Sequence, residues 1–268
     1  MPAIYAHYRF GHYVYEKLNE ELKEIVKKHF SSFLNGLQGP DPLLYHLPYL
    51  PDEITEAGDV IHKEPCIKFL KKAIIEVRKA GMDSGEYAYL IGFLCHFTFD
   101  SEVHYYVDEY ALRNGVSHVF METEFDKYIL KREKKDPLRY DLSTCISCDK
   151  DSAEHMSVFY ECLNEKKAYM VLKEMVMERK LLYTPHDLKY YTLLKIFGLS
   201  SSFRGFSDLL MRKEDEIRCA ESNLYLYKKM MESIDLAILL ILSLDDSIQN
   251  GTAIHSRFYR DFETLKEY

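Results

Sequence analysis

The sequence lacks both a long hydrophobic run and an excess of positive charge. Its longest apolar stretch, residues 236–244, lies between Asp235 and Asp245 and is far shorter than the ~20 residues that a helix needs to cross a bilayer. Lys and Arg number 35 against 43 Asp and Glu, which gives a formal charge of -8 at pH 7. We therefore expect no membrane span, and nucleic acid is a less favoured partner because no basic field attracts a polyanion.

The sequence also lacks a recognisable export signal and paired cysteine motifs. The N-terminus has no basic segment followed by an apolar run and a small-residue cleavage site, so a cytoplasmic location is expected. The six cysteines lie at irregular spacings and are expected to be free thiols. Cys145 and Cys148 form a single C-x-x-C without a second pair, which favours a loop over a metal or redox site.

Helical periodicity is present almost everywhere. Apolar residues recur every three or four positions and the alternation typical of strands is missing, so the sequence predicts an all-α fold. We expect a single all-helical domain over residues 1–268, with a metal-site half at 1–130 and an additional helical half at 140–268. The expected helices cover residues 4–28, 66–80, 84–112, 119–132, 152–180, 186–197, 201–211, 214–248 and 254–266.

Two segments are expected to interrupt the helices. Residues 35–53 contain two Gly and four Pro, which oppose helical backbone and predict an irregular loop. Within this loop Asp41 lies between Pro40 and Pro42, and the following proline favours extended backbone at Asp41. The charged stretch 131–152 is expected to be a hinge or excursion between the two halves.

Histidines and carboxylates recur at helical spacing in the N-terminal half. His96, Asp100 and His104 occupy positions i, i+4 and i+8 of an apolar helix, so they form one stripe on its surface. Ser117 is a predicted N-cap, and His118 and Glu122 follow it one helical turn apart. Two successive helices therefore present five groups of the kind that bind metal ions.

Three further residues complete a set of eight candidate metal ligands. A single histidine is more often a hydrogen-bonded core or surface residue than a ligand. The joint placement of five histidines and three carboxylates nevertheless favours a metal site. Imidazole and carboxylate without thiolate is the mixture typical of catalytic zinc or a related ion. The set is His7, Asp41, His62, His96, Asp100, His104, His118 and Glu122.

The remaining histidines and nearby acids are expected to be structural or exposed. His46 is close enough to Asp41 in sequence to be a candidate for contacting a ligand. Asp108 and Glu124 are expected to be solvated charges on helix faces, and Asp126 either another such charge or a residue that orients a ligand. The structural set is His12, His29, His155, His186 and His255.

The segments that carry these residues resemble the zinc-dependent phospholipase C family of bacteria, whose fold is shared with single-strand-specific zinc nucleases. The resemblance lies in AHYRFG, GPDPL, IHKE, IGFLCHFTFDSEVH and SHVFMETEFD, within residues 6–126. The shared ligand order is His, Asp, His, His-x3-Asp, His, His-x3-Glu. The resemblance implies a multi-helix bundle of the zinc-dependent phospholipase C type that binds two or three zinc ions (Zn²⁺).

The resemblance also implies how the ligands are divided. Asp41, His62, His96 and Asp100 would bind one zinc; His104, His118 and Glu122 would bind a second. His7 and Asp100 would bind a third, with Asp100 bridging. Secreted members complete the third site with an N-terminal tryptophan and have a longer segment before the next His, whereas this chain has no Trp and only three residues between Asp100 and His104.

These features predict a metal-dependent hydrolase of phosphate esters, similar to phospholipase C. Asp41 is the candidate catalytic group that receives a proton from the attacking water, and Arg9 or Arg113 is a candidate phosphate contact. The expected substrate is a phospholipid or small phosphate ester, and peripheral membrane contact is compatible with it. The alternatives are a zinc nuclease and a non-catalytic helical metal-binding or interaction protein; a di-iron bundle is disfavoured because the ligands show no paired Glu-x-x-His.

Overall fold

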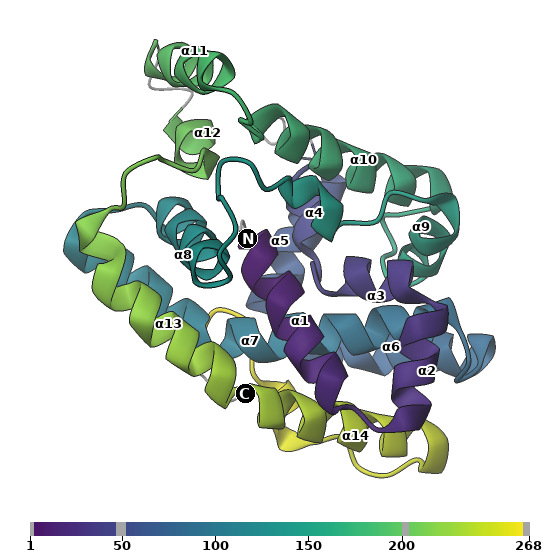
Figure 1. The fold of residues 1–268 in the computed structure, drawn as a ribbon. Coiled ribbons are helices and arrows are strands. Elements are labelled where there is room, and N and C mark those ends of the chain that lie inside the picture. Colours follow the sequence, from purple (N-terminus) through teal and green to yellow (C-terminus); the bar gives the residue numbers. More distant parts are fainter. Residues whose placement is uncertain (1–2, 47–51, 200–203, 265–268) are drawn as a thin grey trace.

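The computed structural model describes residues 3–46, 52–199 and 204–264, and within these ranges the chain is helical without β-strands (Figure 1). The all-α prediction is therefore confirmed. The α-helices are α1 (Ile4–Lys17), α2 (Glu20–Lys28), α3 (Phe30–Gly36), α4 (Asp41–Leu44), α5 (Glu53–Lys63), α6 (Cys66–Ala80), α7 (Gly85–Asn114), α8 (His118–Arg132), α9 (Lys150–Ser157), α10 (Glu165–Leu182), α11 (Asp187–Gly198), α12 (Arg204–Leu209), α13 (Ala220–Glu232) and α14 (Ile234–Asn250). Three 3-10 turns accompany them: η1 (Leu142–Cys145), η3 (Ile217–Cys219) and η4 (Ser256–Tyr259).

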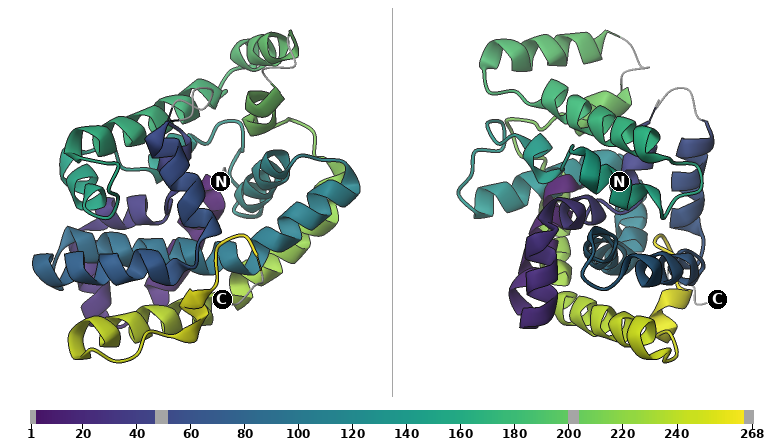
Figure 2. Two further views of the ribbon diagram at one scale, coloured as in Figure 1. Left: turned by 180° about the vertical axis from the view of Figure 1, so that it is seen from behind. Right: turned by 90° about the vertical axis from the view of Figure 1, so that its right-hand side faces the viewer.

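The long helix α7 is the centre of the fold. Its N-terminus is capped by Ser84, whose side chain accepts a hydrogen bond from the Tyr87 amide, and it ends at Gly115 in the left-handed conformation. Most of its residues between Gly85 and Val107 are buried, because α1, α3, α6, α8, α13 and α14 all pack against it. Figures 1 and 2 show these helices surrounding α7. A stripe of polar groups on such a helix is therefore enclosed by protein.

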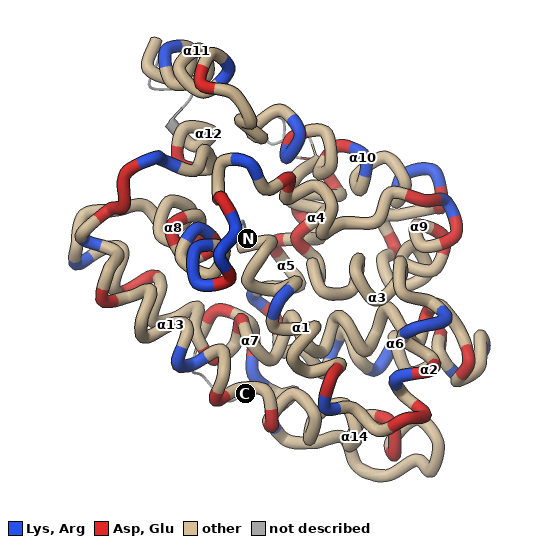
Figure 3. Tube along the Cα trace, in the orientation of Figure 1, with Lys and Arg blue, Asp and Glu red and all other residues tan. Residues whose placement is uncertain are grey.

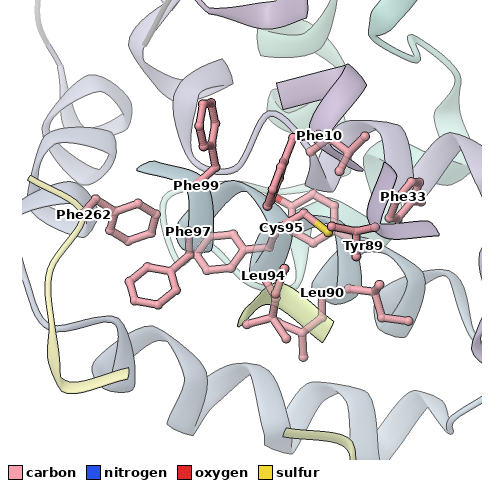
Figure 4. Close-up of a cluster of buried hydrophobic side chains, with 14 of the residues drawn as sticks. Phe10, Phe33, Tyr89, Leu90, Leu94, Cys95, Phe97, Phe99 and Phe262 are labelled. Carbon is pink, nitrogen blue, oxygen red and sulfur yellow. The ribbon is translucent and has the colours of Figure 1, made fainter. Parts of the chain in front are cut away.

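Aromatic side chains form much of the core around α7 (Figure 4). Phe10 and Phe99 stack with ring centroids 5.2 Å apart, and Phe93 stacks on Phe69 of α6 at 4.0 Å. Burying an aromatic side chain contributes on the order of 2 kcal/mol through the hydrophobic effect alone. This packing fixes the positions of α1, α6 and α7, and hence of the polar residues that they carry.

Helix α3 approaches α7 with its backbone in direct contact. A Cβ atom placed on Gly92 of α7 would lie 2.3 Å from the Phe33 carbonyl oxygen, so this close contact requires glycine. The approach carries the turn after α3 over α7 and places Asp41 above the polar stripe. The order of elements thus positions the segment 37–44 next to the predicted ligands.

Several predicted helix boundaries are wrong, each for a local reason. The expected helix 4–28 is divided because Asn19 caps α2 with its side chain, and 152–180 is divided because Asn164 caps α10 in the same way. The expected helix 214–248 is two helices that meet at Ser233, and the described part of 254–266, residues 254–264, contains the turn η4 and no α-helix. Residues 200–203 and 265–268, in which parts of two expected helices fall, lie outside the described residues.

The predicted irregular loop 35–53 is also partly wrong. Asp41 begins the short helix α4 instead of adopting extended backbone, because Pro42 occupies the first turn, where a missing N–H group does no harm. Helix α5 was not predicted. Its start is marked by a capping box in which Asp52 and Thr55 exchange side-chain and backbone hydrogen bonds. Residues 47–51 of the predicted loop lie outside the described residues.

The C-terminal part of the chain contributes to the same core. Helices α13 and α14 pack on α7, and α14 also packs on α1, while α11 and α12 enclose a smaller separate cluster around Tyr190 and Phe197. The division into halves at 1–130 and 140–268 stays a prediction. None of the helices in the described ranges combines the length and apolar character needed to span a bilayer.

Charged residues are mixed in sign over the fold (Figure 3). The basic stretch that follows α8 is conspicuous in this view, but Lys131 pairs with Asp215 at 2.5 Å and Lys135 with Glu133 at 3.2 Å. Neutralised pairs of this kind do not create a long-range attractive field. The arrangement agrees with the weak case for a nucleic-acid partner.

Candidate metal centre

Five helices bring the eight predicted ligands together. His7 comes from α1, Asp41 from α4 and His62 from α5; α7 and α8 supply the others. They lie in two neighbouring sets. We call His7, Asp41, His62, His96 and Asp100 the inner group. The outer group is His104, His118 and Glu122 together with Asp108, which is not among the eight predicted ligands.

The inner group is organised around His96 and Asp100. The two carboxylate oxygens of Asp100 lie 3.2 Å from Nε2 of His7 and 3.4 Å from Nε2 of His96. The rings of His7 and His96 stack with centroids 4.1 Å apart. Asp41 lies on the other side, with Oδ1 at 3.1 Å from Nε2 of His62 and 3.9 Å from Nε2 of His96. All five side chains are almost completely buried, with relative exposures of 0–2%.

Backbone carbonyls fix the orientation of two inner-group histidines. Nδ1 of His62 lies 2.7 Å from the Gly58 carbonyl, and Nδ1 of His96 lies 3.2 Å from the Leu37 carbonyl. A carbonyl oxygen only accepts, so Nδ1 must carry the proton and donate it. In the neutral rings Nε2 therefore presents a lone pair towards Asp41 and Asp100. This is the arrangement that metal-binding histidines commonly have.

The donor atoms of this centre fit a bound cation. Nε2 of His62, whose Nδ1 is committed to Gly58, faces a carboxylate oxygen of Asp41, and two electron-rich atoms come this close only with a proton or a cation between them. Several buried atoms also find no hydrogen-bond partner within the described ranges: Nδ1 of His7, Nε2 of His96, Oδ2 of Asp100, Nε2 of His118 and Oε2 of Glu122. Unpaired buried polar atoms are costly, and coordination would satisfy four of the five, all but Nδ1 of His7.

The outer group is more open to solvent. Nε2 of His118 lies 3.2 Å from Oε1 of Glu122, and its ring centroid is 4.6 Å from that of His104. His104 is 6% exposed and Asp108 is exposed at the surface, so this end of the centre is the one that solvent reaches. Asp100 acts electrostatically on His104, and Glu122 acts on His7, which places the two groups beside each other.

Asp108 was predicted to be a solvated charge, and its side chain is exposed as predicted, but the prediction missed its contacts with two histidines. Its carboxylate lies 2.6 Å from Nδ1 of His118 and 3.4 Å from Nδ1 of His104, so it contacts one histidine from each of the two helices. The sequence spacing could have indicated this role, because Asp108 continues the four-residue repeat of His96, Asp100 and His104 along one face of α7. Asp108 orients both rings so that their Nε2 atoms turn inward, as a carboxylate behind a ligand does.

Replacing Asp108 by asparagine is expected to weaken metal binding by the outer group about 10-fold, the lower end of the range for residues behind a ligand. An amide carries no charge to favour the orientation of the two imidazoles. Titration of the metal-free protein with zinc against a chromophoric chelator measures the change. Glu109→Gln alters the next, equally exposed residue of α7 and should leave affinity unchanged; equal affinities of the two variants would contradict the assignment.

The two buried aspartates remain ionised because of the histidines. Burial alone would raise the pKa of Asp100, but His96 and His7 hold it well below its usual range. Burial acts in the same direction on Asp41, and His96 and His62 again lower its pKa below the usual value. For His96, burial lowers the pKa and the adjacent His7 lowers it further. The inner group thus combines two anionic carboxylates with one histidine, His96, whose neutral form is favoured.

The pKa values of His7, His104 and His118 shift upwards. Burial opposes protonation of His7, but the hydrogen bond that the protonated ring donates to Asp100 raises its pKa above the usual value. For His118, burial is overcome by Glu122 and Asp108, which raise its pKa to about 10. The contact with Asp108 raises the pKa of His104 in the same way against burial. In the absence of a cation, protons therefore occupy the places where a metal ion would bind.

The other acidic residues near the centre have structural roles. Asp126 is buried and accepts hydrogen bonds from the backbone amides of Tyr5 at 3.0 Å and Ala6 at 2.8 Å, which anchors α1 directly before His7. Burial raises its pKa to about 7. Of the two alternatives for Asp126, the orienting one agrees with this contact. Glu124 was expected to be solvated, which is wrong, because it is buried against Lys127 at 2.5 Å.

The remaining sequence candidates lie outside the two groups. His46 contacts Glu174 at 2.7 Å and Asp52 at 3.2 Å, so it links α10 to the start of α5. Arg9 pairs with Glu133 at 2.5 Å, and Arg113 is exposed at the end of α7. We therefore find no support for either arginine as a phosphate contact. Sequence reasoning gave no indication of the buried Arg179 of α10, which lies over the ring of Tyr45 at 5.2 Å.

The backbone of Gly39 packs against the ring of His96, and substitution of this glycine tests that contact. Its φ is +55°, and a Cβ atom there would lie 2.3 Å from Cδ2 of the His96 ring. Gly39→Ala is expected to destabilise the fold by about 2–4 kcal/mol, from left-handed strain and the clash together, and to weaken zinc binding. Gly115 has a φ of +62° with open space around its Cα in the described structure, so Gly115→Ala should show only the strain. Urea unfolding compares the two; equal losses would contradict the contact.

The fold and the site define a class of protein: an all-α bundle whose helices enclose a cluster of imidazole and carboxylate donors. A scan against protein families matches residues 6–173 to the family described as zinc dependent phospholipase C, and the chain belongs to that family. The match includes all eight predicted ligands and ends within α10. Searches of curated proteins and of solved structures found no match.

Proposed function

We propose that this protein is a metal-dependent hydrolase of phosphate esters, a phosphodiesterase similar to phospholipase C, with two or three zinc ions bound by the inner and outer groups. The observation that carries the proposal is the convergence of buried Nε2 and carboxylate atoms that lack hydrogen-bond partners in the described structure. Family membership supports zinc as the metal and a lipid phosphodiester as the substrate class.

The residues would divide the metal ions as follows. Asp41, His62, His96 and Asp100 would hold one ion; the contacts of His62 with Asp41 and of His96 with Asp100 support this assignment. His104, His118 and Glu122 would hold a second ion, with Asp108 behind the rings. His7 and the remaining oxygen of Asp100 would contribute to a third. Zinc in such a site lowers the pKa of water and neutralises charge on phosphoryl oxygens.

Asp41 is the proposed catalytic base. Its carboxylate stays ionised, because His96 and His62 lower its pKa against the effect of burial. It lies on α4, with Oδ1 3.1 Å from Nε2 of His62, and it is buried together with the rest of the inner group. A carboxylate held in this way can accept a proton from a water that attacks the phosphorus atom.

A comparison of substrates tests the proposal. The zinc-loaded protein is incubated with phosphatidylcholine micelles, with a single-stranded oligonucleotide and with bis(p-nitrophenyl) phosphate. We expect release of the phosphorylated head group from the lipid and slower hydrolysis of the small diester. The oligonucleotide should be a poor substrate, because the chain lacks a basic field that attracts nucleic acid. Preferential cleavage of the oligonucleotide would favour the nuclease. Zinc binding without any turnover would contradict the hydrolase and favour a non-catalytic metal-binding protein.

A further inference from the structure

We propose that the C-terminal strap, defined as residues 254–264, completes the inner group, and that Phe262 is a positioning residue for His62 and His96. The inference rests on the proposed metal site and deepens it. The family match ends at residue 173, so the strap lies beyond the part of the chain that the match covers. The strap runs beside α6 and α7 in both views of Figure 2, where it is yellow.

The ring of Phe262 contacts two histidines of the inner group. Its centroid lies 5.2 Å from that of His62 and 6.0 Å from that of His96, and the side chain is completely buried. It also meets Phe97 at 5.0 Å (Figure 4) and Phe93 at 5.9 Å, both in near-perpendicular geometry. Phe262 therefore connects the aromatic core of α7 to the imidazole rings.

The strap is also attached through the backbone to the segment that carries His62. The Phe262 amide donates a hydrogen bond to the carbonyl of His62 at 3.1 Å, and the Cys66 amide donates to the carbonyl of Arg260 at 2.9 Å. These two bonds bracket the junction between α5 and α6. A backbone position held at two points cannot slide relative to the strap without losing both bonds.

A side-chain pair attaches the strap to the other ligand-bearing helix. Arg257 pairs with Glu102 of α7, which lies midway between Asp100 and His104 in sequence. The strap thus joins α5, which supplies His62, to α7, which supplies His96 and Asp100. Asp41 lies between these histidines, so their separation determines whether all three can reach one ion.

The geometry explains how Phe262 would affect the metal. Nδ1 of His62 contacts the Gly58 carbonyl and Nε2 contacts Asp41, but hydrogen bonds to the ring nitrogens act on the edge of the ring and do not support its faces. Phe262 packs against one side of the ring and restricts its rotation. An apolar neighbour also excludes water and strengthens the electrostatic attraction between the ligands and a cation.

A pair of substitutions in the full-length chain tests the inference. Phe262→Ala removes the ring beside the histidines, whereas Phe258→Ala removes an equally buried ring of the strap that meets Phe97 at 5.7 Å. Zinc affinity is measured by competition with a chelator, and the Co²⁺ absorption spectrum reports ligand geometry. We expect affinity to fall at least ~10-fold in Phe262→Ala with an altered Co²⁺ spectrum, and less than ~3-fold in Phe258→Ala with an unchanged one.

Phe262→Leu serves as the conservative variant and as the test if Phe262→Ala fails to fold. It keeps an apolar group of similar size, so we expect an affinity within ~3-fold of wild type and a wild-type spectrum. Equal losses in Phe262→Ala and Phe258→Ala, or a Phe262→Leu variant as weak as Phe262→Ala, would overturn the inference while leaving the metal site intact. A wild-type chain that binds no zinc would instead overturn the proposed function, and the inference with it.

Discussion

Asp100→Asn should remove metal from the inner group and abolish hydrolysis. The two carboxylate oxygens of Asp100 face His7 and His96, and the residue is the one that both proposed inner positions share. An asparagine keeps the shape but loses the charge, and its amide group would direct N–H bonds at one of the two Nε2 atoms. Substitution of a residue that only orients a metal ligand lowers metal affinity 10- to 100-fold. Loss of a ligand that would contribute to both inner positions should therefore lower it more than ~100-fold.

The effect on turnover should be larger still. Without the inner ions, little remains to neutralise charge on the phosphoryl group, and we expect hydrolysis to fall at least ~10³-fold. Zinc content and hydrolysis of bis(p-nitrophenyl) phosphate are measured on the same preparation. Glu109→Gln, on the exposed face of the same helix, is the control. An Asp100→Asn variant with full zinc content and normal turnover would show that Asp100 is a structural aspartate.

Acid should release the metal and stop hydrolysis, and the effect should begin above the ordinary imidazole pKa. A histidine must lose its proton before it can bind zinc. The pKa values of His7 and His104 are raised, and that of His118 is raised to about 10, so protons compete with zinc even near neutral pH. We expect zinc affinity to rise steadily from pH 5 to pH 9, and hydrolysis at pH 5 to be a small fraction of that at pH 8.

The same pKa shifts determine how the metal-free protein responds to pH. A histidine with a raised folded pKa stabilises the fold fully below its unfolded pKa of about 6.5, and this contribution is lost as the pH rises towards the folded value. Asp41 and Asp100 act oppositely: their contribution is present above an unfolded pKa of about 3.9 and is lost only as the pH falls through their lowered folded values. The contributions of these five residues to the stability of the metal-free protein should therefore be largest together between about pH 4 and 6.5.

Unfolding in urea with and without a chelator at pH 5, 7 and 9 checks this prediction. We expect the difference in free energy of unfolding between zinc-loaded and metal-free protein to increase with pH, because the metal-free form loses stability as zinc binding strengthens. A difference that stays constant over this range would mean that the shifted histidines do not bind the metal.

The local pattern of the sequence was sufficient to predict the stripe on α7 and the pair on α8. Residues four apart on a helix share a face whatever the rest of the fold does, so the relation of His96 to Asp100 and of His118 to Glu122 required no tertiary information. The order of the eight ligands carried the family resemblance, and the structure brings all eight into the two groups.

Some of the features that were missed depend on contacts between separate elements of the fold, and one depends on the position of a proline within a helix. Phe262 meets His62 only because the chain returns to α5 after fourteen helices, and no local pattern in the strap indicates that contact. Asp108 continues the four-residue repeat of α7, which indicates its contact with His104, but its contact with His118 depends on the approach of α8. Helix α4 was missed because a proline after Asp41 is unfavourable in a helix interior but acceptable in its first turn.

Elemental analysis of protein purified without added metal tests the central claim most directly. The account predicts at least two zinc ions per chain, reduced in Asp100→Asn and unchanged in Glu109→Gln. A chain that carries no metal after purification, and takes up none when titrated with zinc at pH 8, would contradict it.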